Sequence, residues 1–242
     1  MLSLRAVNQF YGEEHILWDV DLDLIPGSCT GVLGLPGMGK TTLVNCIMGN
    51  LPIDSGSITW QEKNLPPRNL LLQPGVQRAT MGISYVPQGG RLFSQLSVEE
   101  NLQIALLAAQ RAKEHPPLSG VNYEWFPDLH HLRHRRGYEL SWEEQQQLAL
   151  AIAVVSQPKL LILDQPTEGS SLSWQEKMCD ILSQLNREVG MTILLLERQI
   201  PFIRNVADYF CVLHSGRNVA QGKMVSLNEQ MISRWLTSSS SP

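Results

Sequence analysis

The sequence predicts an α/β fold with a mixed central sheet, an antiparallel β subdomain and a helical subdomain. The first segment, Leu2–Ile25, alternates apolar and polar residues, as the strands of an antiparallel edge sheet do. Cys29–Leu33 is an apolar strand that leads into a glycine-rich loop and then a helical pattern. Two further buried-strand candidates, Lys159–Leu163 and Thr192–Leu196, enclose a helix over Ser173–Val189. This βαβ order predicts that the centre of the sheet is parallel.

The remaining elements of the first third follow in chain order. The pair Tyr11–Gly12 predicts a turn between two short strands of the first segment. Thr41–Gly49 has helical spacing, and its final glycine is a typical helix stop. The segment Pro52–Arg78 is rich in Pro, Asn and Gln, which predicts a hairpin and loop. Gly82–Pro87 then returns to a strand.

The middle of the chain is predicted to be mainly helical. Ser97–Ala112 has helix-forming composition, with Glu99 and Glu100 in a first turn where the helix dipole favours negative charge. We expect a helical subdomain over roughly 95–155, inside a single domain that covers residues 1–242. The tail, Thr237–Pro242, has no core-forming pattern and is expected to be frayed.

Composition excludes several classes of partner. The 242 residues carry a net charge of −4, with 17% charged residues, so there is no basic stripe for nucleic acid. No apolar run approaches the roughly 20 residues of a membrane-spanning helix, and the N-terminus lacks the pattern of a signal peptide. Four widely spaced cysteines suit reduced thiols. These features predict a cytoplasmic protein without a direct membrane span.

A glycine-rich motif predicts a phosphate site. Gly34, Gly39, Lys40 and Thr41 fit the pattern G-x-x-x-x-G-K-[ST] between a strand and a helix. Backbone N–H groups of such a loop surround the β-phosphate, the lysine adds positive charge and the hydroxyl ligates Mg²⁺. We therefore predict that ATP and Mg²⁺ bind here. The predicted ATP-binding residues of this loop are Gly34, Leu35, Pro36, Gly37, Met38, Gly39, Lys40, Thr41 and Thr42.

A second motif predicts a carboxylate for the metal. The apolar run that begins at Leu160 ends in Asp164, which is followed by Gln165. Alone, this pattern is typical of an ordinary buried strand that ends at an acidic turn. Beside a phosphate-binding loop, Asp164 is predicted to hold Mg²⁺ together with Thr41.

The order of these segments resembles that of one family. The segments GLPGMGKTT, VPQGGRLF, LSWEEQQQLALA, LLILDQPTEG and ILLLER follow one another as they do in the ATPase subunits of ABC transporters. The resemblance runs almost end to end and implies a P-loop NTPase fold of ABC type. The phrases NQFYGEEHIL and YVPQGGRLFSQLSVEENL are most similar to the subunits of urea and branched-chain amino acid importers.

The resemblance implies roles for residues outside the loop. Tyr11 would stack on adenine, and Gln88 would sense Mg²⁺ and relay to a membrane partner. Ser141 would reach the ATP of a second subunit, and Arg198 stands at the switch position that often carries histidine. The implied partners are transmembrane permease subunits and a second ATPase subunit, in a homodimer or heterodimer. The protein would then lie peripherally on the inner face of the cell membrane.

Departures from the family pattern predict impaired hydrolysis. Gln165 stands where a catalytic glutamate is usual, and loss of a positioned general base commonly slows a reaction by about 10²- to 10⁴-fold. In the signature loop, Trp142 and Glu143 replace two glycines. We therefore expect an importer subunit with weak or no hydrolysis at its own site. The alternative is a catalytically inactive nucleotide-binding subunit with a regulatory or structural role outside transport.

Overall fold

A computed structural model describes residues 1–63, 65–112 and 123–237 of the chain. Almost all of the predicted frayed tail, and residues 113–122 of the predicted helical subdomain, lie outside the described residues. The described part contains two sheets with helices packed against them, which confirms the predicted α/β class.

A four-stranded antiparallel sheet forms the first part of the chain. Its strands, in spatial order, are β2 (Glu14–Asp23), β1 (Leu2–Tyr11), β4 (Ser55–Trp60) and β5 (Arg68–Asn69). The predicted turn is present, because Tyr11 pairs with Glu14 and Gly12 adopts a left-handed φ of 61°. The antiparallel β subdomain is therefore confirmed.

A six-stranded sheet forms the centre of the fold. Its strands, in spatial order, are β10 (Arg217–Lys223), β9 (Tyr209–His214), β3 (Cys29–Leu33), β8 (Thr192–Glu197), β7 (Leu160–Asp164) and β6 (Ile83–Val86). Strands β9, β3, β8, β7 and β6 are parallel to their neighbours, as the βαβ pattern predicts, and β10 is antiparallel to β9. The sequence patterns above did not predict β9 and β10.

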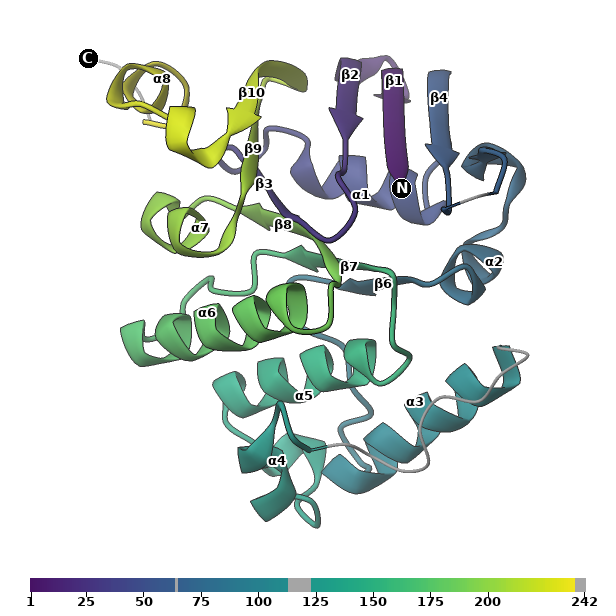
Figure 1. Cartoon of the computed structure of the whole chain (residues 1–242), viewed down its shortest axis with the longest axis vertical. Coiled ribbons are helices and arrows are strands. Elements are labelled where there is room, and N and C mark those ends of the chain that lie inside the picture. The colour runs from purple at the N-terminus through teal and green to yellow at the C-terminus, as the bar shows by residue number, and fades with distance from the viewer. Residues whose placement is uncertain (64, 113–122, 238–242) are drawn as a thin grey trace.

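The described residues also form eight α-helices, labelled in Figure 1, and three short 3₁₀ turns. The helices are α1 (Lys40–Met48), α2 (Gly75–Thr80), α3 (Val98–Ala112), α4 (Pro127–His131), α5 (Trp142–Val154), α6 (Leu172–Arg187), α7 (Ile200–Val206) and α8 (Glu229–Trp235). The 3₁₀ turns are η1 (Leu70–Leu72), η2 (Gly137–Glu139) and η3 (Met224–Ser226). Helices α3, α4 and α5 fall where the helical subdomain is expected, although its boundaries stay a prediction.

Local signals explain where these helices begin and end. Helix α1 ends at Gly49, which has a left-handed φ of 77° and closes the last turn through its N–H group. Helix α3 starts after Ser97, whose hydroxyl accepts a hydrogen bond from the N–H of Glu100 at 3.1 Å. Helix α2 begins inside the segment that was predicted to be hairpin and loop and ends two residues beyond it, so that prediction is only partly correct.

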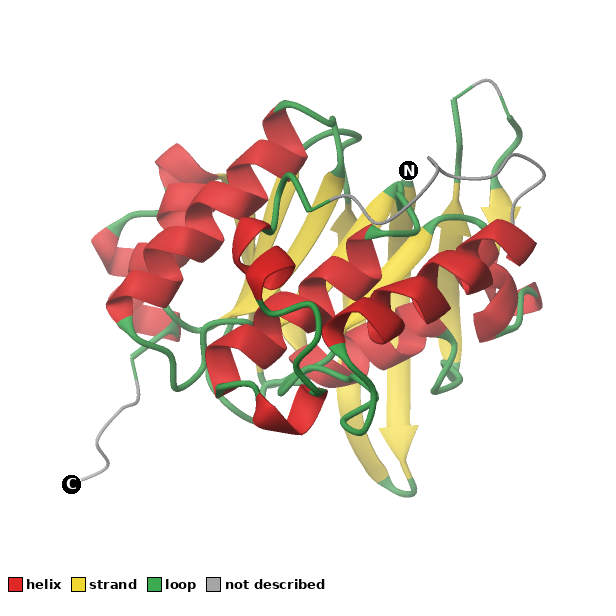
Figure 2. Ribbon diagram, turned by 90° about the horizontal axis from the view of Figure 1, so that it is seen from below, coloured by secondary structure: helices red, strands yellow, loops and turns green. Residues whose placement is uncertain are grey.

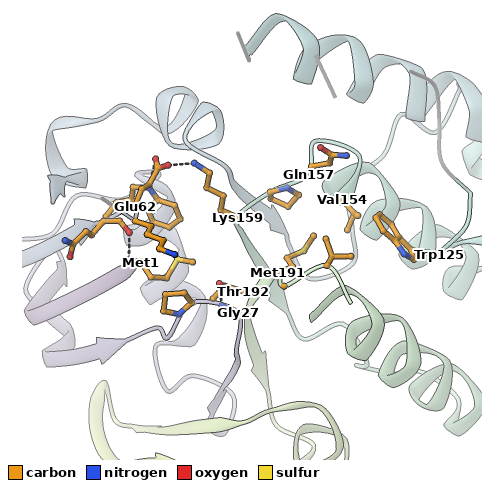
Figure 3. A pocket seen from close by; sticks show the side chains of 16 residues that line it. Met1, Gly27, Glu62, Trp125, Val154, Gln157, Lys159, Met191 and Thr192 are labelled. Carbon is orange, nitrogen blue, oxygen red and sulfur yellow. Dashed lines mark hydrogen bonds and ion pairs between the residues drawn. The ribbon is translucent and has the colours of Figure 1, made fainter. Parts of the chain in front are cut away.

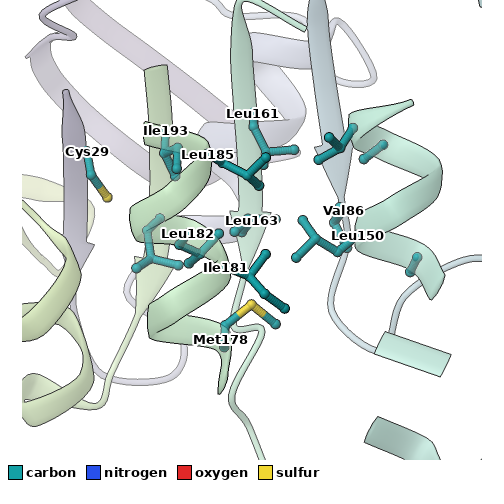
Figure 4. Close-up of a cluster of buried hydrophobic side chains, with 14 of the residues drawn as sticks. Cys29, Val86, Leu150, Leu161, Leu163, Met178, Ile181, Leu182, Leu185 and Ile193 are labelled. Carbon is teal, nitrogen blue, oxygen red and sulfur yellow. The ribbon is translucent and has the colours of Figure 1, made fainter. Parts of the chain in front are cut away.

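Two buried clusters occupy opposite faces of the central sheet. On β7, Leu161 and Leu163 join one cluster, whereas Leu160 and Ile162 join the other. The first cluster also contains apolar residues of α5 and α6 (Figure 4). Burial on both faces explains why this strand has a continuous apolar sequence instead of an alternating one. In Figure 2 most of the helices lie in front of the strands.

No helix of the described ranges combines the length and apolar character needed to cross a membrane.

Candidate nucleotide-binding site

The carboxyl ends of four parallel strands meet at one edge of the central sheet. Leu33 at the end of β3 pairs with Glu197 at the end of β8, and Asp164 at the end of β7 pairs with Leu196. The glycine-rich loop follows β3, and Gln88 follows β6 closely in sequence. In open α/β sheets this edge is where ligands bind.

The glycine-rich loop is held tightly by its surroundings. A Cβ atom on Gly34 would lie 2.6 Å from the carbonyl oxygen of Leu213 in β9, so a larger residue does not fit. Gly39 has a φ of 92°, and a Cβ atom there would lie 3.0 Å from Cδ2 of Leu17. Gly34 is therefore required because the chain approaches it closely. Gly39 is required both by close approach and by its left-handed backbone conformation.

Lys40 is only 4% exposed and points back into the loop. Its Nζ atom donates hydrogen bonds to the carbonyl oxygens of Gly34, at 2.6 Å, and Leu35, at 2.9 Å. Burial lowers the pKa of Lys40, and the negative charges of Asp164 and Glu197 oppose that shift. An ammonium group held by two carbonyl oxygens can exchange them for phosphate oxygens, which accept hydrogen bonds more strongly.

Thr41 and Asp164 form the second part of the site. Thr41 Oγ1 donates a hydrogen bond to Asp164 Oδ2 at 2.8 Å, and Tyr85 Oη donates to the same oxygen at 3.4 Å. The other oxygen, Asp164 Oδ1, is buried and accepts no hydrogen bond within the described part of the chain. Burial raises the pKa of Asp164, and the hydrogen bond from Thr41 and the charge of Lys40 oppose the rise.

This pair fits Mg²⁺ that arrives with a phosphate ligand. Mg²⁺ is usually held by one or two carboxylates, water and substrate phosphates. Asp164 offers an oxygen that accepts no hydrogen bond from any described residue, beside the hydroxyl of Thr41. Within the described ranges, no group of three or more His, Cys, Asp or Glu side chains is placed to hold a metal ion by itself. Gln88 lines the same cavity of about 590 Å³ as Thr41 and Asp164.

Gln165 occupies a constrained backbone position directly after β7. Its φ is +51°, which is uncommon for a residue other than glycine. Its N–H group donates to the carbonyl oxygen of Leu196 at 2.8 Å, which ties the position to β8. The residue is partly exposed. An amide here has the shape of glutamate but cannot accept a proton as a general base at neutral pH.

Glu168 connects the loops after three strands, and the sequence patterns did not identify it. Its Oε2 accepts a hydrogen bond from the amide of Gln88, and its Oε1 lies 3.6 Å from Nη2 of Arg198. The neighbouring Glu197 is fully buried and accepts hydrogen bonds from Thr167 Oγ1 and the N–H of Arg198, both at 2.7 Å. The available sequence signal was an acidic residue at the end of one strand, Glu197, and another four residues beyond the end of its neighbour, Glu168.

The signature segment forms the start of α5. Ser141 is the N-cap, and its hydroxyl accepts a hydrogen bond from the N–H of Glu144 at 3.3 Å. Glu143 accepts hydrogen bonds from the hydroxyl of Ser171 at 2.6 Å and from its N–H at 3.1 Å. Trp142 is 39% exposed. Ser141 lines a separate cavity of about 450 Å³, so the structure does not bring it to Thr41 and Asp164.

Tyr11 ends β1 and is 49% exposed. It pairs across the hairpin with Glu14 at the start of β2. Two residues further along β2, the carbonyl oxygen of Ile16 lies 3.5 Å from the position of a Cβ atom on Gly39. The hairpin therefore runs beside the glycine-rich loop.

Another cavity lies at the opposite end of the parallel strands. It has a volume of about 850 Å³ and is bordered by Lys159 and Thr192, which stand at the amino ends of β7 and β8 (Figure 3). Trp125 and an ion pair between Lys159 and Glu62 also line it. Its position at the amino ends separates it from the glycine-rich loop, so it is not the predicted phosphate site.

Comparisons with known proteins agree with this geometry. The family model described as "ABC transporter" matches residues 17–168. The "Probable branched-chain amino acid transport ATP-binding protein LivF" of Archaeoglobus fulgidus is 34% identical over 232 residues, which cover 95% of this chain and 94% of that protein. The "High-affinity branched-chain amino acid transport ATP-binding protein BraG" of Pseudomonas aeruginosa is 34% identical over 222 residues, covering 90% of this chain and 91% of that protein.

A solved structure has the same fold. It is a dimeric ATP-binding cassette in a post-hydrolysis state, bound to ADP and phosphate, and it superposes with a TM-score of 0.76 at 22% identity. The superposition covers 93% of this chain and 99% of that chain. Together with the matched family model and the two relatives, it confirms the resemblance seen in the sequence. The chain therefore belongs to the ABC transporter family, as one of its ATP-binding proteins.

Proposed function

We propose that this chain is the ATP-binding subunit of an ABC importer for branched-chain amino acids. The observation that carries the proposal is the pairing of Thr41 with Asp164 beside the buried Lys40, at the edge where β3 and β7 end. The two relatives named for branched-chain amino acid transport support the solute. Urea is the alternative solute, and it rests on the sequence resemblance alone.

The proposed roles follow from the contacts of each residue. The loop over Gly34–Thr42 holds the phosphates of ATP, and Lys40 exchanges its carbonyl contacts for phosphate oxygens. Thr41 and Asp164 hold Mg²⁺, with Gln88 in the same cavity. Mg²⁺, when bound, neutralises charge on the phosphates. Tyr11 stacks on adenine, for which its exposed ring is available.

Hydrolysis by the chain alone is proposed to be weak. Gln165 stands directly after Asp164, where it can orient water but cannot remove its proton. In a dimer, Ser141 would reach the second subunit's ATP, with Trp142 and Glu143 beside it instead of two glycines. A bulky side chain and a carboxylate near a phosphate both oppose close approach.

The proposed partners complete the transporter. A second ATPase subunit, identical or different, pairs with the chain, as the dimeric cassette of the same fold does. Transmembrane permease subunits dock on the side where Gln88 and α5 border one cavity. The chain then lies in the cytoplasm, peripheral on the inner face of the cell membrane.

Two measurements on the purified chain test the nucleotide site. Equilibrium binding of Mg-ATP should be lost or weakened at least tenfold in Lys40→Ala, because the variant removes the positive charge of the loop. Phosphate release should be slow in the wild type and should rise in Gln165→Glu. Unchanged binding in Lys40→Ala would refute the proposed site. No rise in turnover for Gln165→Glu, although ATP binds, would refute the account of slow hydrolysis.

Reconstitution tests the transport role. The chain would be combined with its permease subunits in vesicles, and ATP-dependent uptake of labelled leucine and urea would be compared. Uptake of leucine without uptake of urea supports branched-chain amino acids as the solute. Uptake of urea without uptake of leucine refutes that assignment and identifies urea as the solute. Binding of ATP without uptake or Lys40-dependent turnover would point to the inactive nucleotide-binding subunit instead.

A further inference from the structure

Glu168 receives donors from two other loops of the site. It lies in the loop after β7, whereas Gln88 follows β6 and Arg198 follows β8. The amide of Gln88 donates to Glu168 Oε2, and the guanidinium of Arg198 lies 3.6 Å from Oε1. One carboxylate therefore holds two donors that stand at the same sheet edge as the glycine-rich loop.

The cluster of Gln88, Glu168 and Arg198 lies at the edge of the candidate nucleotide site. The charges of Glu168 and Arg198 both contribute, with opposite signs, to the electrostatic environment of Lys40. Gln88, which donates to Glu168, lines the same cavity as Thr41 and Asp164, so the cluster borders the candidate Mg²⁺ and phosphate site. The carboxylates of Asp164 and Glu197, at the ends of β7 and β8, also raise the pKa of Lys40.

The side chains of the cluster can move without changing the backbone. Glu197 accepts a hydrogen bond from the N–H of Arg198 at 2.7 Å, and the N–H of Glu168 donates to the carbonyl oxygen of Gln165 at 3.2 Å. The side chains themselves are 42% exposed for Arg198 and 34% exposed for Glu168. A partly exposed ion pair of this kind is weak enough to be exchanged for another anion.

We propose that Glu168 competes with the terminal phosphate of ATP for Arg198 and Gln88, and so sets how well the site distinguishes ATP from ADP. Without nucleotide, the carboxylate of Glu168 accepts a hydrogen bond from Gln88 and pairs with the guanidinium of Arg198. A terminal phosphate offers a stronger, more highly charged acceptor to a guanidinium, so ATP releases the donors from Glu168. ADP lacks that phosphate, so Glu168 keeps its contacts with Gln88 and Arg198. This inference rests on the proposed ATP site.

The competition predicts opposite effects for two substitutions. Glu168→Gln keeps the size of the side chain but removes the negative charge, which frees Arg198 and removes repulsion toward the terminal phosphate. The ratio of ATP affinity to ADP affinity should therefore rise, by about three- to tenfold. Arg198→Gln removes the charged donor, and the same ratio should fall by a similar factor. In the double variant, the gain from Glu168→Gln should largely disappear, because Arg198, the charged donor for which Glu168 competes, is already absent.

The experiment measures equilibrium binding of a non-hydrolysable ATP analogue and of ADP, each with Mg²⁺, to the full chain. Arg204→Gln is the matched control, because Arg204 also pairs with a glutamate, Glu229, at 3.3 Å and has a similar exposure of 40%. That control should leave the ratio unchanged. Thermal unfolding without nucleotide verifies that each variant is folded.

The outcomes separate this inference from the proposed function. If nucleotide binds in a Lys40-dependent manner but neither substitution changes the ratio more than Arg204→Gln does, the competition is refuted and the nucleotide site stands. If the ratio falls in Glu168→Gln, Glu168 aids ATP binding and the inference is also refuted. If no nucleotide binds at all, the proposed function fails, and this inference fails with it.

Discussion

Replacing Arg78 with methionine removes a buried guanidinium that joins α1 to the segment before α2. Arg78 is 4% exposed, and its Nη1 donates to the carbonyl oxygens of Cys46, at 2.8 Å, and Ile47, at 2.6 Å. Its Nε donates to the carbonyl oxygen of Gln73 at 2.9 Å. The guanidinium also packs on Gly49, where a Cβ atom would lie 2.8 Å from Cζ. The side chain thus donates to carbonyl groups in the last turn of α1, where the regular hydrogen bonds of the helix run out.

The size of the effect follows from these contacts. A hydrogen bond to a charged group contributes about 1.5–3 kcal/mol, and three such bonds are lost. Their sum is an upper limit, because burial lowers the pKa of Arg78, which shows that the charge is partly desolvated, and the variant recovers that cost. We expect Arg78→Met to lower the free energy of unfolding by about 2–4 kcal/mol. For a domain of this size, that corresponds to a fall in Tm of about 5–15 °C.

Chemical and thermal unfolding of the nucleotide-free chain measure this loss. Arg68→Met is the matched control, because Arg68 lies in β5 and is exposed, and its loss should change the free energy of unfolding by about 0.5 kcal/mol or less. The difference between the two variants isolates the contribution of the buried contacts. Equal losses in Arg78→Met and Arg68→Met would refute the argument that these three carbonyl contacts stabilise the end of α1.

Three further substitutions test other parts of the site. Burial raises the pKa of Asp164, so the native state keeps a proton that the unfolded state releases, and stability is lost as pH rises from the ordinary aspartate pKa of about 3.9 through the raised value. Asp164→Asn removes this titration, so its stability relative to the wild type should rise over that pH interval, and an unfolding midpoint difference that is independent of pH would contradict this. Glu143→Gly removes an exposed contact with Ser171, so it should cost less than about 1 kcal/mol in unfolding while raising ATP turnover, and a turnover equal to that of the wild type would count against an obstructed signature. Gly34→Ala places a Cβ atom against the carbonyl oxygen of Leu213, so calorimetry should show a loss of about 1–3 kcal/mol in stability together with weaker ATP binding, and a fully stable variant would show that the loop has room.

Local sequence patterns were sufficient to predict the elements whose residue types are set by burial or by backbone conformation. Strands β7 and β8 contain the apolar runs Leu160–Leu163 and Ile193–Leu196 because every residue of these strands is buried in the central sheet. The glycine-rich loop was identified because its residue types are required by its backbone, as Gly34 and Gly39 show. Strand β10 was not predicted, because an edge strand with the sequence RNVAQGK lacks a clear apolar pattern.

The contacts within the site depended on the order of the strands. Thr41 and Asp164 are 123 residues apart in sequence, yet they are hydrogen-bonded because β3 and β7 both flank β8 and end at one edge. Gln88, Glu168 and Arg198 meet for the same reason, since each follows a different strand of that sheet. No local pattern specifies which loops become neighbours.

The sequence by itself therefore determined the fold class, the family resemblance, the phosphate-binding loop and the replacement of a glutamate by Gln165, because each of these is written in consecutive residues. Only the tertiary structure decided that Glu168 holds Gln88 and Arg198, and that Arg78 closes the end of α1. These contacts join residues from separate elements, and their partners are set by strand order and burial, which are properties of the whole chain rather than of any one segment.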